Sequence, residues 1–483
     1  MFNSSTRISL IIGLLCLWFA GLYNLSFGQQ TTQMKVDSLL ALAEYTQDFG
    51  GYSVGILTPL GEIYTGGNGI YNLGIGANDN DTTKFGLADL SQHLMAVLTL
   101  KLVEDGSISL SDQIGANVLL AAPLTAVPPS TTIEQLLRHT SGIKDFSQSP
   151  NYFNNALSIV FQDLSFGFET LNYQPITSQY LSSQGAANAS GTFSYSLTNY
   201  MVLGEKLEQQ FSGQTIQDLL NTNILAPAGV DSILIYNVGR QQPSGVEAGF
   251  TYNLSGVLPE ILSFQTSVLT STGASASIIS NPQDFLTYAK ALFGGQILNQ
   301  NSLNLLLDFQ PAAGREINGV QVDGYSYGTE QFQLDVAGQQ ESVIGHYGGV
   351  NYNTLFAYSQ TLNAGVFISH NWHESDTANL VELAGKLLEV AKDDMVMSIE
   401  DELATQVTLS PNPAQSELTV QWDLNLVGEV KIEVYDLQGN RVVSTRSIAN
   451  QPVSVNVESL STGLYILKME TNRGTFTRKF IKE

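Results

Sequence analysis

Apolar residues follow two different patterns in the first part of the chain. Residues 51–74 contain two short extended stretches joined by a turn at 59–61, which predicts a β-hairpin that ends in a glycine-rich loop. Residues 89–105 are apolar around most of a helical circumference and stop at Gly106. A helix with this pattern is expected to be buried in the core of the domain.

Helical periodicity continues through the middle of the chain, and strand-like stretches return only late. The expected helices cover Ile133–Leu137, Thr198–Gln210, Pro282–Leu292, Asn301–Leu307 and Asp376–Lys392, and the late strand-like stretches cover Gly324–Leu334 and Leu355–Ser369. A hairpin first, helices in the middle and strands last predict a mixed sheet flanked by helices. The edge and the centre of this sheet would come from opposite ends of the region.

The last part of the chain has short stretches of alternating apolar and polar residues, separated by turn signals. These stretches are Val407–Leu409, Leu418–Trp422, Val430–Tyr435, Val453–Val457, Leu464–Met469 and Thr475–Ile481. This spacing is typical of a small all-β sandwich.

The N-terminus has the layout of a cleavable signal peptide over residues 1–28. Arg7 precedes an apolar run from Ile8 to Tyr23, and small and polar residues follow. The run is short for a bilayer span, which takes about 20 residues, although an uncleaved anchor is the alternative. Cys16, the single cysteine, lies inside this run. The mature chain would then have no disulfide, no thiol nucleophile and no cysteine-ligated metal.

The charge of the chain argues against some classes of binding partner, and its uneven distribution marks a domain boundary. The 483 residues carry 44 acidic and 20 basic side chains, a formal charge of −24, which argues against binding nucleic acid or an anionic membrane. Residues 405–483 hold eight of each sign, so the excess lies before them. We therefore predict a signal peptide at 1–28, a first domain at 29–395, a linker at 396–404 and a second domain at 405–483. The acidic residues 393–406 fit either a linker or a last helical turn.

Three short patterns have weaker claims to chemistry. Gly51–Gly55 spells GxSxG, but its serine lies in a predicted strand, and Ser141–Lys144 spells SxxK in a predicted loop. His370 and His373 are three residues apart with acidic residues nearby, so a metal is conceivable, but a solvated loop is the favoured interpretation. We predict no metal and no cofactor.

A longer series of stretches has the character of one family. FGLADLSQHLMAVLTLKLVEDGSISLSDQI from Phe85 resembles the serine β-lactamase and penicillin-binding-protein family, in its class C, esterase and D-aminopeptidase-like branch. Four more stretches agree with the family in the same order, LLRHTSGIKDF, FSYSLTNYMVLGEKLE, GASASIISNPQDFLTYAKAL and GHYGGVNYNTLFAYS. The resemblance implies a serine β-lactamase-like α/β fold with a helical subdomain.

The resemblance also shows what this sequence lacks. The family attacks a carbonyl with a serine at the start of the buried helix and places a lysine one turn later. These positions hold Asp89 and Gln92. Ser91 would point to the opposite face of the helix. Asp89 and Gln92 also fit a DxxQ capping box, and the helix dipole would keep Asp89 ionised, which favours cationic or neutral ligands.

Two later family motifs survive in part. The YxN motif appears as Tyr195-Ser196-Leu197, and the KTG or HxG motif appears as His346-Tyr347-Gly348. The resemblance implies that Asp89, Gln92, Tyr195, Leu197, His346, Tyr347 and Gly348 line a ligand-binding cleft. Tyr195 and His346 can equally be packed, hydrogen-bonded core residues.

The last domain resembles the C-terminal sorting domain of the type IX secretion system of Bacteroidota. LSPNPAQSELTV, IEVYDLQGNRV, LSTGLYILKME and GTFTRKFIKE carry this similarity. It implies that the secretion machinery is a partner and that the protein is secreted or displayed on the cell surface, with no membrane span after signal removal. An adhesive or carbohydrate-binding sandwich is the alternative.

The favoured functional hypothesis is a secreted, catalytically degenerate protein that binds a small molecule or peptide, or serves as a scaffold, at the cell surface. The alternative is an active hydrolase of an ester, amide or D-amino-acid peptide with a rearranged site, for example Tyr195 and His346 activating water. A third interpretation gives the first domain a purely structural role at the surface.

Overall fold

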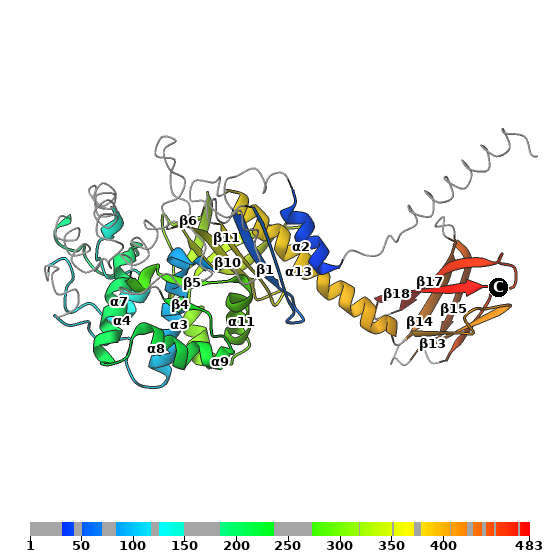
Figure 1. The fold of residues 1–483 in the computed structure, drawn as a ribbon, viewed down its shortest axis with the longest axis horizontal. Helices are drawn as coiled ribbons and strands as arrows, with labels where there is room; N and C mark the ends of the chain where they lie inside the picture. Colours follow the sequence, from blue (N-terminus) through cyan, green and yellow to red (C-terminus); the bar gives the residue numbers. More distant parts are fainter. Residues whose placement is uncertain are drawn as a thin grey trace, which may run out of the picture. The chain divides into compact units, whose positions relative to one another are not determined.

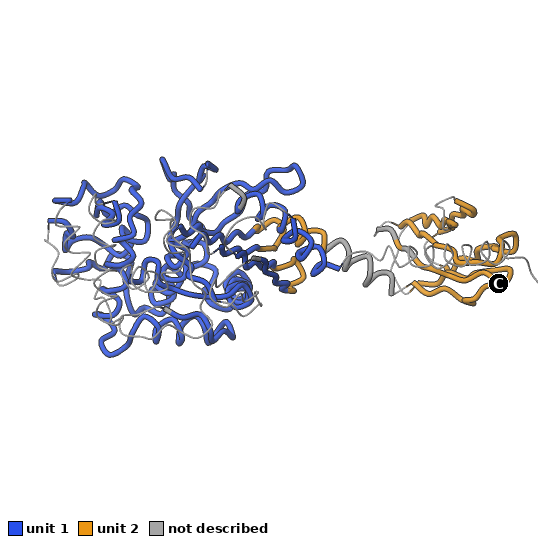
Figure 2. The backbone as a smooth tube through the Cα atoms, turned by 45° about the horizontal axis from the view of Figure 1, so that its top comes forward, with its two compact units in different colours: residues 1–56, 63–358, 366–387 blue, residues 57–62, 359–365, 388–483 orange. Residues whose placement is uncertain are grey.

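The computed structural model describes most of the chain in two compact units. It describes residues 31–42, 51–69, 84–116, 125–148, 184–235, 273–317, 319–349, 352–370, 378–405, 407–422, 428–436, 441–448, 451–471 and 474–483. The first unit holds residues 1–56, 63–358 and 366–387, and the second holds 57–62, 359–365 and 388–483 (Figure 2). The predicted signal peptide lies outside the described residues.

An eight-stranded sheet forms the centre of the first unit (Figure 1). Its order is β2 (Ile63–Gly69), β1 (Gly51–Leu57), β11 (Ala364–His370), β10 (Asn353–Ser359), β9 (Gln339–Gly348), β8 (Glu330–Val336), β7 (Val320–Tyr325) and β6 (Glu316–Ile317). The N-terminal hairpin thus forms one edge and lies next to the last strand of the unit, as the order of the sequence patterns predicts.

Each late strand-like stretch contains two antiparallel strands. The stretch at 324–334 includes the end of β7 and most of β8, with a turn between them. The stretch at 355–369 includes β10 and β11. The hydrophobic pattern identifies the extended segments, but the turns between them lack strong breakers over several residues, so the pattern joins the strands.

Strands β1, β10 and β11 are buried at every position, which shows that helices cover the sheet. Three glycines let helices lie close to the sheet. An added Cβ on Gly55 would lie 2.7 Å from Leu286 of α11, and one on Gly66 would lie 3.1 Å from Leu40 of α2. An added Cβ on Gly385 of α13 would lie 2.2 Å from the carbonyl oxygen of Asp335. The bounds are α2 Thr32–Leu40, α4 Ile133–Leu137, α7 Leu197–Gln210, α8 Ile216–Leu220, α9 Ala226–Ala228, α11 Pro282–Phe293, α12 Gln300–Leu306 and α13 Ala378–Thr405.

The helix expected at 89–105 has two parts. A short 3₁₀ turn, η2 (Ala88–Leu90), leads into α3 (Ser91–Glu104), whose residues are almost all buried, as the apolar pattern predicts. A small sheet of β3 (Phe85–Gly86), β5 (Ile278–Ser280) and β4 (Leu234–Ile235) lies at the start of this helix. The amide of Leu87 donates to the carbonyl of Ile278 at 2.8 Å, which ties the η2 turn to β5.

The expected linker at 396–404 is helical, because α13 continues to Thr405. The stretch from 393 to 405 has neither glycine nor proline, and it holds two methionines, two glutamates, one leucine and one alanine, all of which favour helices. The division between the two compact units falls inside this helix, between Leu387 and Leu388. High acidity alone therefore did not distinguish a linker from a helix.

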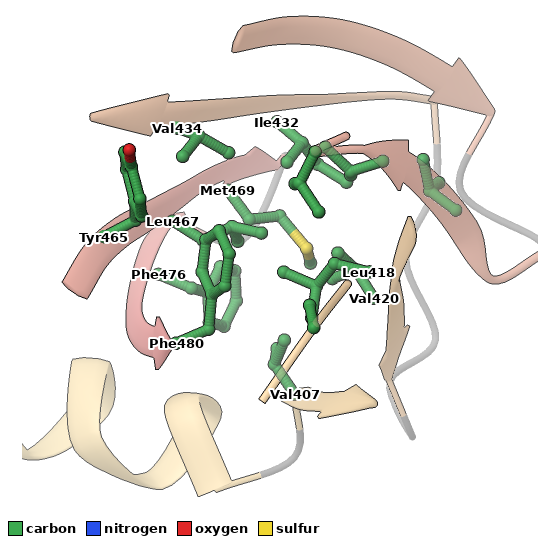
Figure 3. Packing of buried hydrophobic residues seen from close by; sticks show 14 of the residues in the cluster. Val407, Leu418, Val420, Ile432, Val434, Tyr465, Leu467, Met469, Phe476 and Phe480 are labelled. Atoms are coloured by element: carbon green, nitrogen blue, oxygen red, sulfur yellow. The ribbon is translucent and has the colours of Figure 1, made fainter. Parts of the chain in front are cut away.

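The C-terminal part is a sandwich of two sheets. The first has the order β12 (Val407–Ser410), β13 (Glu417–Trp422) and β16 (Val453–Asn456), and the second has the order β15 (Arg441–Ile448), β14 (Glu429–Tyr435), β17 (Gly463–Thr471) and β18 (Gly474–Lys482). Side chains of both sheets meet in one apolar core, as Leu418, Val420, Ile432 and Met469 do in Figure 3.

Strand β15 was missed by the sequence analysis. It is an edge strand whose side chains are all exposed or half-exposed, so it lacks the apolar alternation that marks a strand with one buried face. The other six strands of the sandwich are confirmed. Within the described part of the chain, no helix is both long and apolar enough to cross a membrane.

Candidate active site

The start of α3 presents Asp89 and Gln92, the two residues expected at the positions of the family's serine and lysine. Asp89 lies in the η2 turn, and Gln92 lies in the first turn of α3. Ala88 before them has φ +47°, a left-handed conformation that is uncommon for a residue with a Cβ. Ser91 accepts a hydrogen bond on Oγ from the amide of Ile278 at 3.1 Å. Ser91 therefore links the helix to β5.

The predicted capping box between Asp89 and Gln92 is wrong. The residue that precedes α3 is Leu90, and no side-chain hydrogen bond caps the helix there among the described residues. The Gln92 side chain points to other partners, described below, so it does not reach the backbone of Asp89. Tertiary partners outcompete the local bond because they satisfy a wholly buried amide.

Gln92 is the centre of a buried hydrogen-bond network. Its Nε2 donates to the hydroxyl of Tyr195 at 2.8 Å. Its Oε1 lies 3.1 Å from Nε2 of His139 and 3.4 Å from the hydroxyl of Tyr325, which donates to it. The amide thus uses both its donor and its acceptor, and an uncharged group occupies the place of the family's ammonium.

His139 fixes the polarity of this network. Its Nδ1 accepts from the amide of Ser196 at 3.3 Å and lies 2.9 Å from Nδ2 of Asn199. Because Nδ1 is an acceptor, the ring proton lies on Nε2 and points to Gln92. Burial, His346 and Arg315 all lower the pKa of His139 well below its ordinary value, so the ring is neutral. The sequence analysis did not select His139, although it lies in the LLRHTSGIKDF stretch.

A second group of residues surrounds Tyr195. The guanidinium carbon of Arg315 lies 4.0 Å from the centre of the Tyr195 ring, a cation–π contact. Nε of Arg315 donates to Oε1 of Glu330 at 2.6 Å, and Oε2 of Glu330 accepts from the amide of Tyr347 at 2.9 Å. Burial opposes ionisation of Glu330, but Arg315, His346 and the Tyr347 amide outweigh it and lower the pKa of this carboxyl.

His346 of β9 lies beside this pair. Its Nδ1 is 2.7 Å from the carbonyl oxygen of Tyr347, to which it donates, and 4.0 Å from Oε2 of Glu330. Burial lowers the pKa of His346, against the opposing effect of Glu330, so the ring is neutral at neutral pH. Its Nε2 therefore carries a lone pair, and that atom has no hydrogen-bond partner among the described residues.

Asp89 carries the most unusual electrostatics of the cluster. The pKa of its carboxyl is raised to about 7: burial is the main cause, Asp145 and Glu330 add to the rise, and Arg315 and the amide of Gly349 oppose it. The hypothesis that the helix dipole keeps Asp89 fully ionised is therefore wrong, because loss of hydration outweighs the dipole. Oδ1 of Asp89 has no hydrogen-bond partner in the described part of the chain.

The remaining residues expected around the site pack beside this cluster. An added Cβ on Gly348 would lie 2.5 Å from the Leu87 oxygen and 2.8 Å from the Asp89 nitrogen, so this glycine lets β9 approach the η2 turn. The Tyr347 hydroxyl donates to Asn353 at 2.8 Å, and the Leu197 amide donates to Asp145 at 3.3 Å. Leu197 is buried at the start of α7.

The weaker sequence patterns have structural roles. Ser53 of the GxSxG pattern is buried inside strand β1. Ser141 donates to Asn199 at 2.6 Å, and Lys144 donates to the Gln184 carbonyl at 2.7 Å, so the SxxK serine and lysine have separate partners in a loop. His370 is stacked on Tyr52, and His373 lies outside the described residues. Among the residues described, no group of side chains is arranged to hold a metal.

Comparison with known sequences identifies the two parts of the chain. The model of the beta-lactamase family matches residues 35–390, about three quarters of the chain, so the chain belongs to the beta-lactamase family. The model of the secretion system C-terminal sorting domain matches residues 408–483. This domain implies the type IX secretion machinery and indicates export to the cell surface or secretion.

Individual relatives agree with this assignment. Penicillin-binding protein 4* of Bacillus subtilis (strain 168) is 26% identical over 282 residues, which are 56% of this chain and 57% of that protein. The chain thus matches little more than half the length of this curated relative. D-amino acid amidase from Ochrobactrum anthropi SV3, complexed with L-phenylalanine amide, has a TM-score of 0.61 at 20% identity and covers 75% of this chain and 98% of its own.

A second solved structure covers more of the chain. The octameric penicillin-binding protein homologue from Pyrococcus abyssi has a TM-score of 0.54 at 17% identity over 90% of this chain and 92% of its own. At identities this low, the similarity concerns the fold alone. These two structures support the serine β-lactamase-like α/β fold, with its antiparallel sheet, flanking helices and following small β-sandwich.

Proposed function

We propose that this protein is a catalytically silent member of the beta-lactamase family that binds a small ligand at the cluster around Asp89 and Gln92. The observation that carries the proposal is the hydrogen-bond network of Gln92. An amide in the position of the family's lysine, bonded to Tyr195 and His139, cannot accept a proton from a nucleophile as an amine can.

Within the described part of the chain, neither Asp89 nor Tyr195 is suited to replace the missing nucleophile. Acyl transfer to Asp89 would produce an anhydride, and no ammonium stands at position 92 to assist. Burial and the charge of Asp89 raise the pKa of Tyr195 well above its ordinary value, so its hydroxyl stays protonated. A protonated phenol is a weak nucleophile and a suitable hydrogen-bond donor to a bound ligand.

The names of the relatives suggest the kind of ligand to test. One relative is a penicillin-binding protein, and one solved relative is an amidase complexed with an amino-acid amide. The purified protein, incubated with a fluorescent penicillin, a chromogenic cephalosporin and a nitrophenyl ester, is expected to show no covalent label and no turnover. Covalent labelling of the unmodified protein would refute the proposal.

The matched variant tests whether only the reactive pair is missing. Asp89→Ser combined with Gln92→Lys is expected to give slow acylation by the fluorescent penicillin. Circular dichroism and a thermal melt check that the double variant is folded. A folded double variant with no label after long incubation would mean that the rest of the site is also unsuited to acyl transfer.

A second candidate function is hydrolysis with a rearranged site. The unpartnered Nε2 of the neutral His346 favours it, because such an atom can accept a proton from an attacking water. If esters or amides of D-amino acids are turned over, His346→Gln and Tyr195→Phe should both abolish the turnover. If both variants keep the turnover, this mechanism is excluded.

Export is proposed to use both ends of the chain. We infer cleavage of a signal peptide near residue 28, passage through the type IX system of a Bacteroidota cell, and release or display at the surface. Deleting 405–483 should retain the protein in the periplasm, and mass spectrometry of secreted protein should show a new N-terminus after the apolar run. A purely structural surface role would predict that no ligand changes the melting temperature.

A further inference from the structure

Exposed apolar side chains gather at one end of the outer face of the sandwich's four-stranded sheet. Leu467 of β17 and Phe480 of β18 point into the apolar core of the sandwich (Figure 3). Because side chains alternate along a strand, Leu464, Ile466 and Ile481 lie on the opposite, outer face. Leu464 is 40% exposed and Ile481 is 47% exposed. Grouped apolar side chains with this exposure mark a surface that contacts another molecule.

The strand register makes these side chains neighbours. Leu464 of β17 is paired with Ile481 of β18. Ile466 is paired with Tyr435 of β14 on one side and with Lys479 of β18 on the other. Side chains of paired residues on one face of a sheet are close enough to touch. We define the apolar patch as Tyr435, Leu464, Ile466 and Ile481, with Lys479 at its rim.

Ion pairs occupy much of the rest of this outer face. Nζ of Lys431 lies 3.1 Å from a carboxylate oxygen of Glu433 and 3.3 Å from one of Glu470. Nη1 of Arg441 lies 2.7 Å from the other oxygen of Glu433. These charges are therefore matched within the sheet. Lys479, in contrast, is exposed and has no ion pair with any residue that the structure describes.

The outer face of the three-stranded sheet has a different character. Its outward side chains are all polar, and only one of them is charged: Thr408, Ser410, Glu417, Thr419, Gln421, Ser454 and Asn456. The apolar patch is therefore a local feature of one end of one sheet, and not a general property of the surface of this domain.

Charge distinguishes between the possible occupants of the apolar patch. An anionic lipid surface is attracted by a cluster of unpaired cations, whereas the patch offers Lys479 alone. In a two-fold contact between copies of this chain, the patch would face itself and would bring no carboxylate to Lys479. A different protein, with an apolar contact surface and a carboxylate opposite Lys479, complements both features of the patch.

The C-terminal domain matches the family of secretion sorting domains. We propose that this domain docks through the apolar patch on a protein of the secretion machinery, with Leu464 and Ile481 at the centre of the contact and Lys479 paired with a carboxylate of that protein. This inference rests on the proposed export route and names the surface that the route uses. The ion pairs around Glu433 stay outside the centre of the contact, because removing water from paired charges costs free energy.

Export of the full chain from a Bacteroidota host with a type IX system tests the proposal. Quantitative immunoblots of the medium, the cell surface and the periplasm measure the exported fraction. In Leu464→Thr combined with Ile481→Thr, this fraction should fall by about fivefold or more, because apolar residues at the centre of a contact contribute most to binding. The protein should accumulate in the periplasm. Threonine preserves the preference for a strand at both positions.

Ile448→Thr is the matched control. Ile448 is 73% exposed on the outer face of the opposite edge strand, β15, where it is paired with Glu429 and lies outside the apolar patch. This substitution should leave the exported fraction unchanged. Lys479→Glu should lower the fraction, and Lys479→Arg should preserve it, because only the first reverses the charge. Thermal melts of the purified variants verify that each is folded.

Several results would overturn the inference. They are full export of the variant with threonine at 464 and 481, an equal loss of export in Ile448→Thr, and full export of Lys479→Glu. Two further results would assign the patch to another occupant. One is a dimer of the unmodified protein in sedimentation that the double variant lacks, and the other is binding to phosphatidylglycerol vesicles that the double variant loses.

The failure of the proposed export route has a different signature. If the chain without residues 405–483 is exported as well as the full chain, the route itself is wrong. If that deletion is retained in the periplasm and the variant with threonine at 464 and 481 is exported normally, the route stands and the docking surface lies elsewhere on the domain.

Discussion

The Gln92 amide donates a hydrogen bond to the Tyr195 hydroxyl at 2.8 Å, while its oxygen faces the ring N–H of His139 at 3.1 Å. Residues 103 and 47 positions apart in the sequence are thus connected through one neutral side chain. The bond places an uncharged group next to the tyrosine, where the family normally has an ammonium. The chemistry of the site and part of its stability depend on this arrangement.

Replacing the amide of Gln92 should be costly. Gln92→Met keeps the length of the side chain but leaves the N–H of His139 and the hydroxyls of Tyr195 and Tyr325 without their partner. Because unsatisfied buried polar groups each cost about 1–3 kcal/mol, we expect unfolding free energy to fall by about 3–5 kcal/mol in urea denaturation. Gln300→Met at an exposed position of α12 should change it by less than about 0.5 kcal/mol. Equal losses of unfolding free energy in the two variants would contradict a stabilising role of the Gln92 hydrogen-bond network.

Asp89 should give the protein a distinctive dependence of stability on pH. The pKa is raised from 3.8 to about 7 by burial, against opposition from Arg315 and reinforced by Asp145 and Glu330. Between about pH 4 and pH 7, Asp89 therefore keeps its proton in the folded state and has lost it in the unfolded state. The stabilising contribution is complete below about pH 4 and is lost as the pH rises to about 7.

An isosteric variant isolates this contribution. Asp89→Asn resembles the protonated aspartate at every pH, so it should match the unmodified protein near pH 4 and exceed its unfolding free energy by about 2–4 kcal/mol at pH 8. Urea denaturation at both pH values measures the difference. A constant difference between the two proteins across this range would show that the aspartate does not titrate there.

Two arginines that stack on tyrosines allow a matched comparison. Arg315 lies on Tyr195 at 4.0 Å and pairs with the wholly buried Glu330, whereas Arg138 lies on Tyr327 at 4.2 Å and pairs with Glu134 and Asp308, whose side chains are half-exposed. Arg315→Met should lower the unfolding free energy by about 3–5 kcal/mol, since it leaves a buried carboxylate unpaired.

The corresponding loss for Arg138→Met should be about 1 kcal/mol, because water can solvate its former partners. For Arg315→Lys, the loss of unfolding free energy should lie between those of Arg315→Met and Arg138→Met, since the charge is kept and the planar stacking on Tyr195 is lost. Thermal melts of the three variants measure this order. A smaller effect at Arg315 than at Arg138 would mean that Glu330 finds another partner.

Two neighbouring glycines test how closely β9 approaches the η2 turn. A Cβ on Gly348 would lie between 2.5 and 2.9 Å from backbone atoms of 87, 89 and 90, which cannot move aside easily. A Cβ on Gly349 would lie 3.1 Å from the hydroxyl of the Tyr347 side chain. Gly348→Ala should lower the unfolding free energy by about 2 kcal/mol or more, and Gly349→Ala by less than about 1 kcal/mol. Chemical denaturation of the pair measures both.

Much of the architecture was predictable because it depends on local patterns. The apolar circumference of residues 89–105 identified a buried helix, and the alternation in 407–481 identified six of the seven strands of the sandwich. Strand β15 was missed, since an edge strand without a buried face has no alternation to detect. The sequence left residues 396–404 open between a linker and a last helical turn, and α13 continues through them.

The candidate site was predictable only in part. Asp89, Gln92, Tyr195 and His346 stand at motif positions, so their presence near one site could be proposed from the order of the motifs. His139, Arg315 and Glu330 have no such local signal. Arg315 lies just before the two-residue strand β6, and the pairing of β6 with β7 and of β7 with β8 brings it to Glu330.

The sequence by itself determined the class of fold and the presence of a sorting domain, since each depends on residue identity and spacing. Tertiary structure alone decided the surroundings of Asp89 and Gln92. Whether Asp89 caps a helix or stays unpaired, and whether it is ionised, depends on burial and on charges contributed by residues far away in the chain. Hydration and Coulomb interactions are set by distances in space, which no local pattern encodes.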